Sequence, residues 1–132
     1  MAGSGRWTLA AAITAVALAV AMLVAPATAV RITGTKHADR LHGSRNGDRL
    51  LGRGGDDRLS GRRGRDLIDG GTDADRLFGG PGFDQLLGKS GDDTINARDG
   101  EPDAIDCGDG YDRAVVDRTE DGVFDCEEVV EP

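Results

Sequence analysis

Seven aspartates recur at intervals of nine residues in the middle of this chain, and their carboxylates are its strongest candidates for chemistry. Each has a glycine five residues before it and a leucine or isoleucine two residues after it. Carboxylate oxygens are the ligands that hard divalent cations such as calcium prefer. The candidate metal ligands are Asp39, Asp48, Asp57, Asp66, Asp75, Asp84 and Asp93.

The repeating unit reads G-x-x-x-x-D-x-(L/I)-x from Gly34 to Asn96. The three residues around each aliphatic residue are expected to form a short strand, with the aliphatic side chain pointing inward. The glycine-rich and aspartate-rich remainder is expected to form a turn, in which glycine supplies positive φ and Asn46 or Asp73 tolerates it. One apolar residue in nine cannot build a core alone, so the units must stack.

This unit resembles the nonapeptide repeat of the RTX calcium-binding family, G-G-x-G-x-D-x-U-x, in which U is a large aliphatic residue. The unit around Gly80-Pro81-Gly82-Phe83-Asp84 is the closest to that pattern. The resemblance implies an all-β, right-handed parallel β-roll, or β-helix solenoid. Two units would form one coil, so that each residue lies above its counterpart two units further along the chain.

In such a roll the aspartates fall into two columns on opposite edges. One column holds Asp39, Asp57, Asp75 and Asp93, and the other holds Asp48, Asp66 and Asp84. Stacked carboxylates about 5 Å apart repel by about 3 kcal/mol per contact at an effective dielectric near 20. One calcium ion in each gap would reverse this repulsion and gives about five sites. The alternative is that these are turn aspartates that accept hydrogen bonds from their own backbone.

Composition supports a link between metal binding and folding. The chain has a net charge of −8, 21 glycines and 4% aromatic residues, which is typical of disordered chains. About five calcium ions would nearly cancel that charge. We therefore expect a chain that is disordered without calcium and folded with it.

Residues 1–29 have the features of a signal peptide. Arg6 precedes a long apolar run, and Ala27-Thr28-Ala29 is a small-residue cleavage site. We expect cleavage after Ala29 and a secreted, extracellular protein, for which the family resemblance implies a bacterial source. The alternative is a retained membrane anchor. Residues 30–96 would then form the calcium-binding roll, and residues 97–132 a continuation of the solenoid and its C-terminal cap.

The cap contains both cysteines of the chain. After Asn96 the register slips by one residue, and the next Asp-x-aliphatic units begin at Asp103, Asp112 and Asp121. The spacing of Cys107 and Cys126 exceeds a full coil of two units by a single residue, so a disulfide between them is geometrically reasonable. Two free thiols or a two-ligand metal contact are the alternatives.

Basic residues suggest a second class of function. Arg40, Arg58 and Arg76 occupy the same position in successive coils and are expected to form an outward ladder on one face. The ladder could bind a cell-surface polysaccharide or another glycan, as in an adhesion module. Alternatively, these arginines pair with nearby aspartates. A nucleic-acid partner is not expected for so acidic a chain.

An enzyme is not expected. The sequence has no nucleophile elbow, no phosphate-binding loop and no histidine-rich metal cluster. We interpret His37 and His42, the two histidines, as surface loop residues, with a metal or catalytic role as the alternative. We expect a monomer that binds calcium, and we keep a purely structural solenoid that needs no metal as a further alternative.

Overall fold

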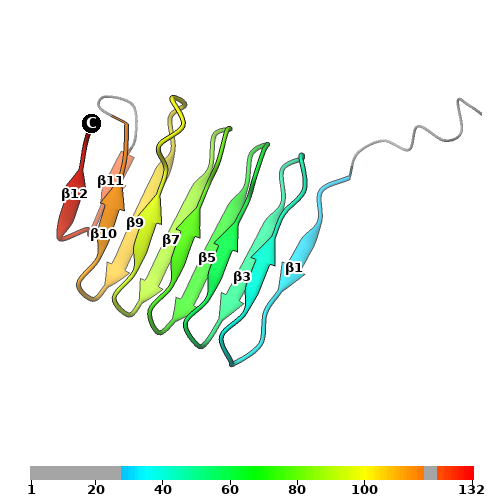
Figure 1. Ribbon diagram of the computed structural model, residues 1–132, viewed down its shortest axis with the longest axis horizontal. Helices are drawn as coiled ribbons and strands as arrows, with labels where there is room; N and C mark the ends of the chain where they lie inside the picture. The colour runs from blue at the N-terminus through cyan, green and yellow to red at the C-terminus, as the bar shows by residue number, and fades with distance from the viewer. Residues whose placement is uncertain (1–27, 118–121) are drawn as a thin grey trace, which may run out of the picture.

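The computed structural model describes residues 28–117 and 122–132 as a parallel β-solenoid (Figure 1). Nearly all of the expected signal peptide lies outside the described residues, and so does Asp121. Within the described ranges we find no helix that is long and apolar enough to cross a membrane. The all-β solenoid expected from the sequence is confirmed.

Twelve short strands form two six-stranded sheets, and every strand pair is parallel. The first sheet contains, in spatial order, β1 (Arg31–Thr33), β3 (Arg49–Arg53), β5 (Leu67–Thr72), β7 (Gln85–Ser90), β9 (Ala104–Asp109) and β11 (Gly122–Phe124). The second contains β2 (Arg40–His42), β4 (Arg58–Ser60), β6 (Arg76–Phe78), β8 (Thr94–Asn96), β10 (Arg113–Val115) and β12 (Glu128–Val130). Odd and even strands therefore alternate between the two sheets, as two units per coil require.

The register follows the predicted coil length through the repeats. Leu50 pairs with Ile68, and Leu59 pairs with Leu77, so each residue meets its counterpart two units further along the chain. The next step is longer by one residue in both sheets, since Gln85 pairs with Ala104 and Thr94 pairs with Arg113. The one-residue slip seen in the sequence is thus one extra residue in the turn between β8 and β9.

Side chains alternate along each strand, and this places the aspartate inside the solenoid. In Asp-x-aliphatic-x-Gly, the first, third and fifth residues point inward, so Asp48, Leu50 and Gly52 are buried while Arg49 is exposed. The aliphatic residues form the core in two columns, as predicted. The core residues are Leu50, Leu59, Ile68, Leu77, Leu86, Ile95, Ala97, Ile105, Cys107, Ala114 and Val116.

The glycine that opens each unit is needed for space. A Cβ at Gly34 would lie 2.5 Å from the carbonyl oxygen of Gly52 and 2.9 Å from Oδ2 of Asp39. Positive φ is instead found at the second and fourth positions of the units, for example in Gly80 and Gly82. The glycine and aspartate columns are therefore sterically linked.

The two non-glycine turn residues differ in conformation. Asp73 has a φ of 76° and so tolerates the positive φ, as expected. Asn46 does not have a positive φ, so its tolerance stays a prediction. The reason is local: the Oγ of Ser44 accepts a hydrogen bond from the Asn46 amide (3.2 Å), which gives this turn another conformation.

The predicted disulfide is present. Cys107, which is buried on β9, is bonded to Cys126, and their Cα atoms are 5.2 Å apart. Cys126 follows β11, so the bond joins the last two coils of the cap.

Arg62 is predicted to carry backbone strain that glycine would relieve. Its φ is 82°, while Gly80, which occupies the same position one coil later, has a φ of 85°. We expect Arg62→Gly to stabilise the fold by about 1 kcal/mol, measured by thermal unfolding at fixed calcium. Arg63→Gly is the control, because Arg63 has no positive φ. It should destabilise by about 0.5–1 kcal/mol, and equal effects of the two substitutions would contradict the assignment.

Candidate metal centre

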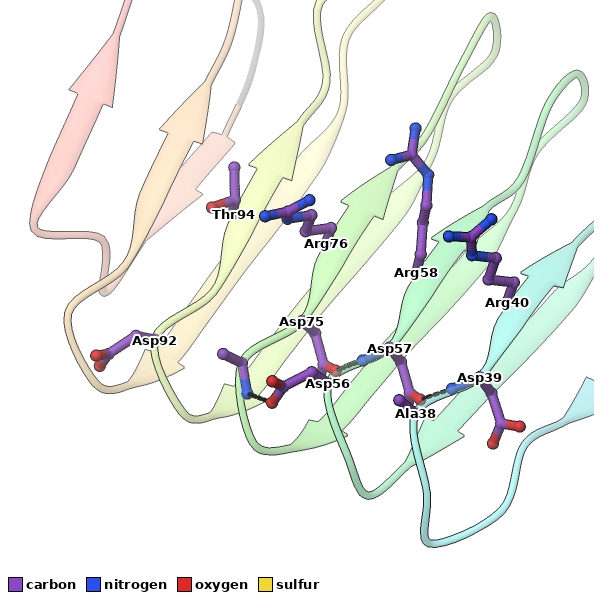
Figure 2. Close-up of a pocket in the computed structure, with 11 residues that line it drawn as sticks. Ala38, Asp39, Arg40, Asp56, Asp57, Arg58, Asp75, Arg76, Asp92 and Thr94 are labelled. Carbon is purple, nitrogen blue, oxygen red and sulfur yellow. Dashed lines mark hydrogen bonds between the residues drawn. The ribbon is translucent and has the colours of Figure 1, made fainter.

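Each column aspartate of the repeats after Asp39 accepts a hydrogen bond from the coil before it. Oδ1 of Asp57 accepts a hydrogen bond from the Asp39 amide (2.7 Å), and Oδ1 of Asp75 accepts one from the Asp57 amide (2.8 Å), as Figure 2 shows. On the other edge, Oδ1 of Asp84 is linked to the Asp66 amide in the same way (2.8 Å). The structure therefore brings the seven predicted residues together in the two expected columns.

Both columns continue into the cap. Asp103 accepts a hydrogen bond from the Asp84 amide (2.7 Å), and Asp112 accepts one from the Asp93 amide (2.7 Å). Glu127 ends the second of these columns, because its Oε2 accepts from the Asp112 amide (2.8 Å). The seven predicted ligands omit these residues, although the nine-residue spacing from Asp103 to Asp112 was a signal that could have found them.

The second oxygen of most of these carboxylates has no such partner. In six aspartates from the second coil onward, this Oδ2 atom is buried and accepts no hydrogen bond from any donor that the structure describes. These residues are Asp57, Asp66, Asp75, Asp84, Asp93 and Asp112. A buried charged oxygen without a partner costs several kcal/mol, so this arrangement requires a proton or a cation.

The first coil differs in this respect. Oδ2 of Asp39 accepts hydrogen bonds from the amide (2.6 Å) and the hydroxyl (2.9 Å) of Thr35. Oδ2 of Asp48 accepts one from the Ser44 amide. Asp39 and Asp48 therefore satisfy their charges within their own turns.

The glycine column adds carbonyl oxygens to the carboxylates. The position that a Cβ of Gly70 would occupy lies 2.5 Å from Oδ2 of Asp75 and 3.0 Å from the carbonyl oxygen of Gly88 in the next coil. Carboxylate and carbonyl oxygens are the donors that calcium takes, whereas zinc prefers nitrogen or sulfur. The residues present thus fit a calcium-type cation.

Burial raises the pKa of the aspartates in the middle coils. It raises the pKa of Asp75 and Asp84 to about 7, and the pKa of Asp66 and Asp93 to about 6, with neighbouring carboxylates adding to the effect. In the first coil, by contrast, hydrogen bonds from the Thr35 amide and hydroxyl lower the pKa of Asp39. The negative charge is therefore least favourable on the aspartates whose Oδ2 atom has no hydrogen-bond donor.

A groove lies along each column. The first, of about 450 Å³, is lined by Asp39, Asp57 and Asp75 with the arginines that follow them (Figure 2). The second, of about 620 Å³, is lined by residues that include Asp66, Asp84 and Asp103. Both columns therefore lie directly beneath a groove in the surface.

Comparison with known families identifies this architecture. The family model described as RTX calcium-binding nonapeptide repeat (4 copies) matches residues 33–68, 51–86 and 69–101. Together these segments span more than half of the chain. The chain belongs to the RTX calcium-binding nonapeptide repeat family. Its solenoid is thus a structural, calcium-binding fold and not a typical enzyme fold.

The cap residues of this RTX protein, Asp103 and Asp112, lie beyond the matched segments, although they extend the same columns. No curated protein and no solved structure matches the chain.

Without calcium, the RTX solenoid is predicted to be an acid-stable fold. The raised pKa values mean that the folded state binds more protons than the unfolded state, whose aspartates titrate near 3.8. Stability is therefore fully present below about pH 4 and is lost as the pH rises toward about 7. Asp39 and Asp48, whose pKa values are lowered, act in the opposite direction but are fewer. Far-UV circular dichroism in chelator should show strand signal at low pH that disappears near neutrality, and a strand signal that increases with pH would contradict this.

Proposed function

We propose that this RTX protein binds calcium through its aspartate columns and that calcium binding drives its folding. The observation that carries the proposal is the set of buried Oδ2 atoms without a hydrogen-bond donor. Asp57, Asp75 and Asp93 with Asp112 would supply ligands on one edge. Asp66 and Asp84 would do so on the other. Asp39 and Asp48, whose Oδ2 atoms already have donors, would contribute less.

Calcium suits these columns better than a proton or magnesium does. At neutral pH a proton is held weakly by groups whose pKa is about 6 to 7. Magnesium demands near-ideal octahedral geometry and gives up its water reluctantly, whereas calcium accepts six to eight oxygens flexibly. Buried, closely spaced oxygens therefore favour calcium.

The coupling to folding follows from how little else stabilises the coils. The core receives one aliphatic side chain per half-coil, such as Leu59 or Leu77, and the aspartates lie directly beside it. Packing that core thus requires burial of the carboxylates at the same time. A bound cation would offset their charge, so that metal binding and core formation occur together.

Two features support secretion of this protein. The predicted signal peptide would export the chain, and the bond between Cys107 and Cys126 suits an oxidising compartment. Extracellular calcium-binding modules have dissociation constants of about 10⁻⁴–10⁻³ M. The chain would then remain unfolded inside the cell and fold outside it.

A calcium titration of residues 30–132 tests this function. In chelator at neutral pH we expect a coil spectrum in the far-UV, which changes to a strand spectrum near millimolar calcium, because the ions neutralise the columns. Magnesium at the same concentration should have little effect. A strand spectrum at neutral pH in chelator would instead support a solenoid that needs no metal.

A specific observation favours a second function, the binding of an anionic polysaccharide. In the described part of the chain, the ion pair present is Arg113 with Glu128 (3.4 Å), so Arg40, Arg58 and Arg76 do not pair with the aspartates beside them. The three arginines are register partners on neighbouring strands of the second sheet, and the Arg58 guanidinium lies 4.7 Å from the centre of the Phe78 ring. They form a row of positive charge that is free to bind a linear polyanion.

Replacement of the ladder tests this second function. We expect the triple variant R40Q/R58Q/R76Q to bind immobilised dextran sulfate at least tenfold more weakly at fixed calcium, because its charges are removed. R45Q/R63Q/R65Q is the matched control, since it removes the same charge from turns. Equal losses in both variants would indicate a non-specific effect of net charge, and calcium affinity should be similar in both.

A further inference from the structure

The spacing from β7 to β9 differs from that between all earlier neighbouring strands of the same sheet. The turn between Asn96 and Asp103 is one residue longer than its counterparts, which gives the longer step in register. Ala97 occupies the place of the opening glycine, since its amide bonds to Val115 (2.9 Å) as the Gly79 amide bonds to Asn96 (3.2 Å). The extra residue therefore lies between Ala97 and Asp103, where it changes the course of the turn.

This longer turn brings a third carboxylate to the column. Asp84, Asp99 and Asp103 each offer an oxygen, and these three oxygens lie within 4.8 Å of one another. Asp84 and Asp103 are 3% and 5% exposed, and Asp99 is half-buried. Among residues 28–117 and 122–132, this is the one place where three such ligands gather.

Hydrogen bonds hold Asp99 in place without neutralising it. Oδ2 of Asp117, in the next coil, accepts hydrogen bonds from the amides of Asp99 (2.9 Å) and Gly100 (2.6 Å). Oδ1 of Asp99 accepts one from the Glu101 amide (2.7 Å). The turn is thus fixed from both sides, and the Asp99 carboxylate is positioned before any ion arrives.

A second observation shows that the cluster needs a ligand. Oδ2 of Asp84 is fully buried and has no hydrogen-bond partner, while its Oδ1 is already used by the Asp66 amide. In the described part of the chain, neither Asp84 nor Asp99 forms an ion pair with an arginine or a lysine.

We propose that Asp84, Asp99 and Asp103 form a separate calcium site, which binds more tightly than the sites between the repeats. The proposal rests on calcium binding as the function of the columns. Calcium affinity in protein sites increases with the number of charged ligands and with the rigidity of the site. This cluster offers three carboxylates, whereas the other steps in the described residues offer fewer within the same reach, and Asp117 fixes the turn that carries the third.

The test compares Asp99→Asn with Asp106→Asn in residues 30–132. Asparagine keeps the acceptor for the Glu101 amide and removes the charge, while Asp106 lies exposed on the outer face of β9. Isothermal titration with calcium should show one fewer tight ion in D99N, or that ion bound at least tenfold more weakly. D106N should titrate like the wild type.

Thermal unfolding gives a second readout, because the sign of the effect should depend on calcium. D99N should unfold at a higher temperature than the wild type in chelator at pH 5, because the substitution relieves repulsion, and at a lower temperature in saturating calcium. D99E, which restores the charge, should recover most of the affinity and keeps the test usable should D99N fold poorly. A residue with only a structural role would lower the unfolding temperature in both conditions.

The results of these experiments distinguish the separate calcium site from calcium binding by the columns. Calcium uptake by wild type and D99N with equal count and affinity would overturn the separate site and leave calcium binding by the columns intact. Absence of calcium uptake by the wild type would overturn both. Recovery in D99E together with loss in D99N would establish that the charge at position 99 is what holds the ion.

Discussion

The burial of a carboxylate beside a glycine, once in every half-coil of the repeats, is the constraint on which this structure depends. Because side chains alternate along the strand, the aspartate and the aliphatic residue share the inner face, and the core cannot form without the carboxylate. In the repeats the opening glycine leaves room for the Oδ2 atom, since a Cβ on Gly70 would lie 2.5 Å from Oδ2 of Asp75. The residues that form the candidate metal site are therefore also the residues that the fold requires.

The two ends of the solenoid handle this constraint differently. At the first coil, Thr35 and Ser44 supply donors to the aspartates of their own turns, so that this end is satisfied by protein atoms alone. Toward the cap, the columns continue through Asp112 to Glu127, and the Cys107–Cys126 bond holds the last coils together. The middle coils, where the pKa values are raised most, have neither device and rely on an external charge.

Most of the fold could be predicted from the sequence. Glycine, aspartate and an aliphatic residue recur every nine residues, and this pattern determines the strands, the turns and the length of the coil together. The two aspartate columns, the core and the disulfide followed from that period. The space requirement of the opening glycine and the conformation of Asn46 did not, because both depend on atoms of neighbouring residues. The approach of Asp99 to Asp84 was also hidden, since the sequence shows that a residue is added but not where the longer turn places it.

The hydrogen bonds between aspartates of the same column all run in one direction, from the backbone amide of one aspartate to the carboxylate of the aspartate in the next coil. From Asp57 to Asp93, each column aspartate accepts a hydrogen bond from the coil before it, so the coils of the repeats make the same contacts with their neighbours. Gain or loss of two consecutive units would therefore restore these contacts. The arginine row and the longer turn lie at opposite edges, and gain or loss of a single unit between them would place both at the same edge. The length of this solenoid can therefore change by whole coils, although the motif visible in the sequence corresponds to half a coil.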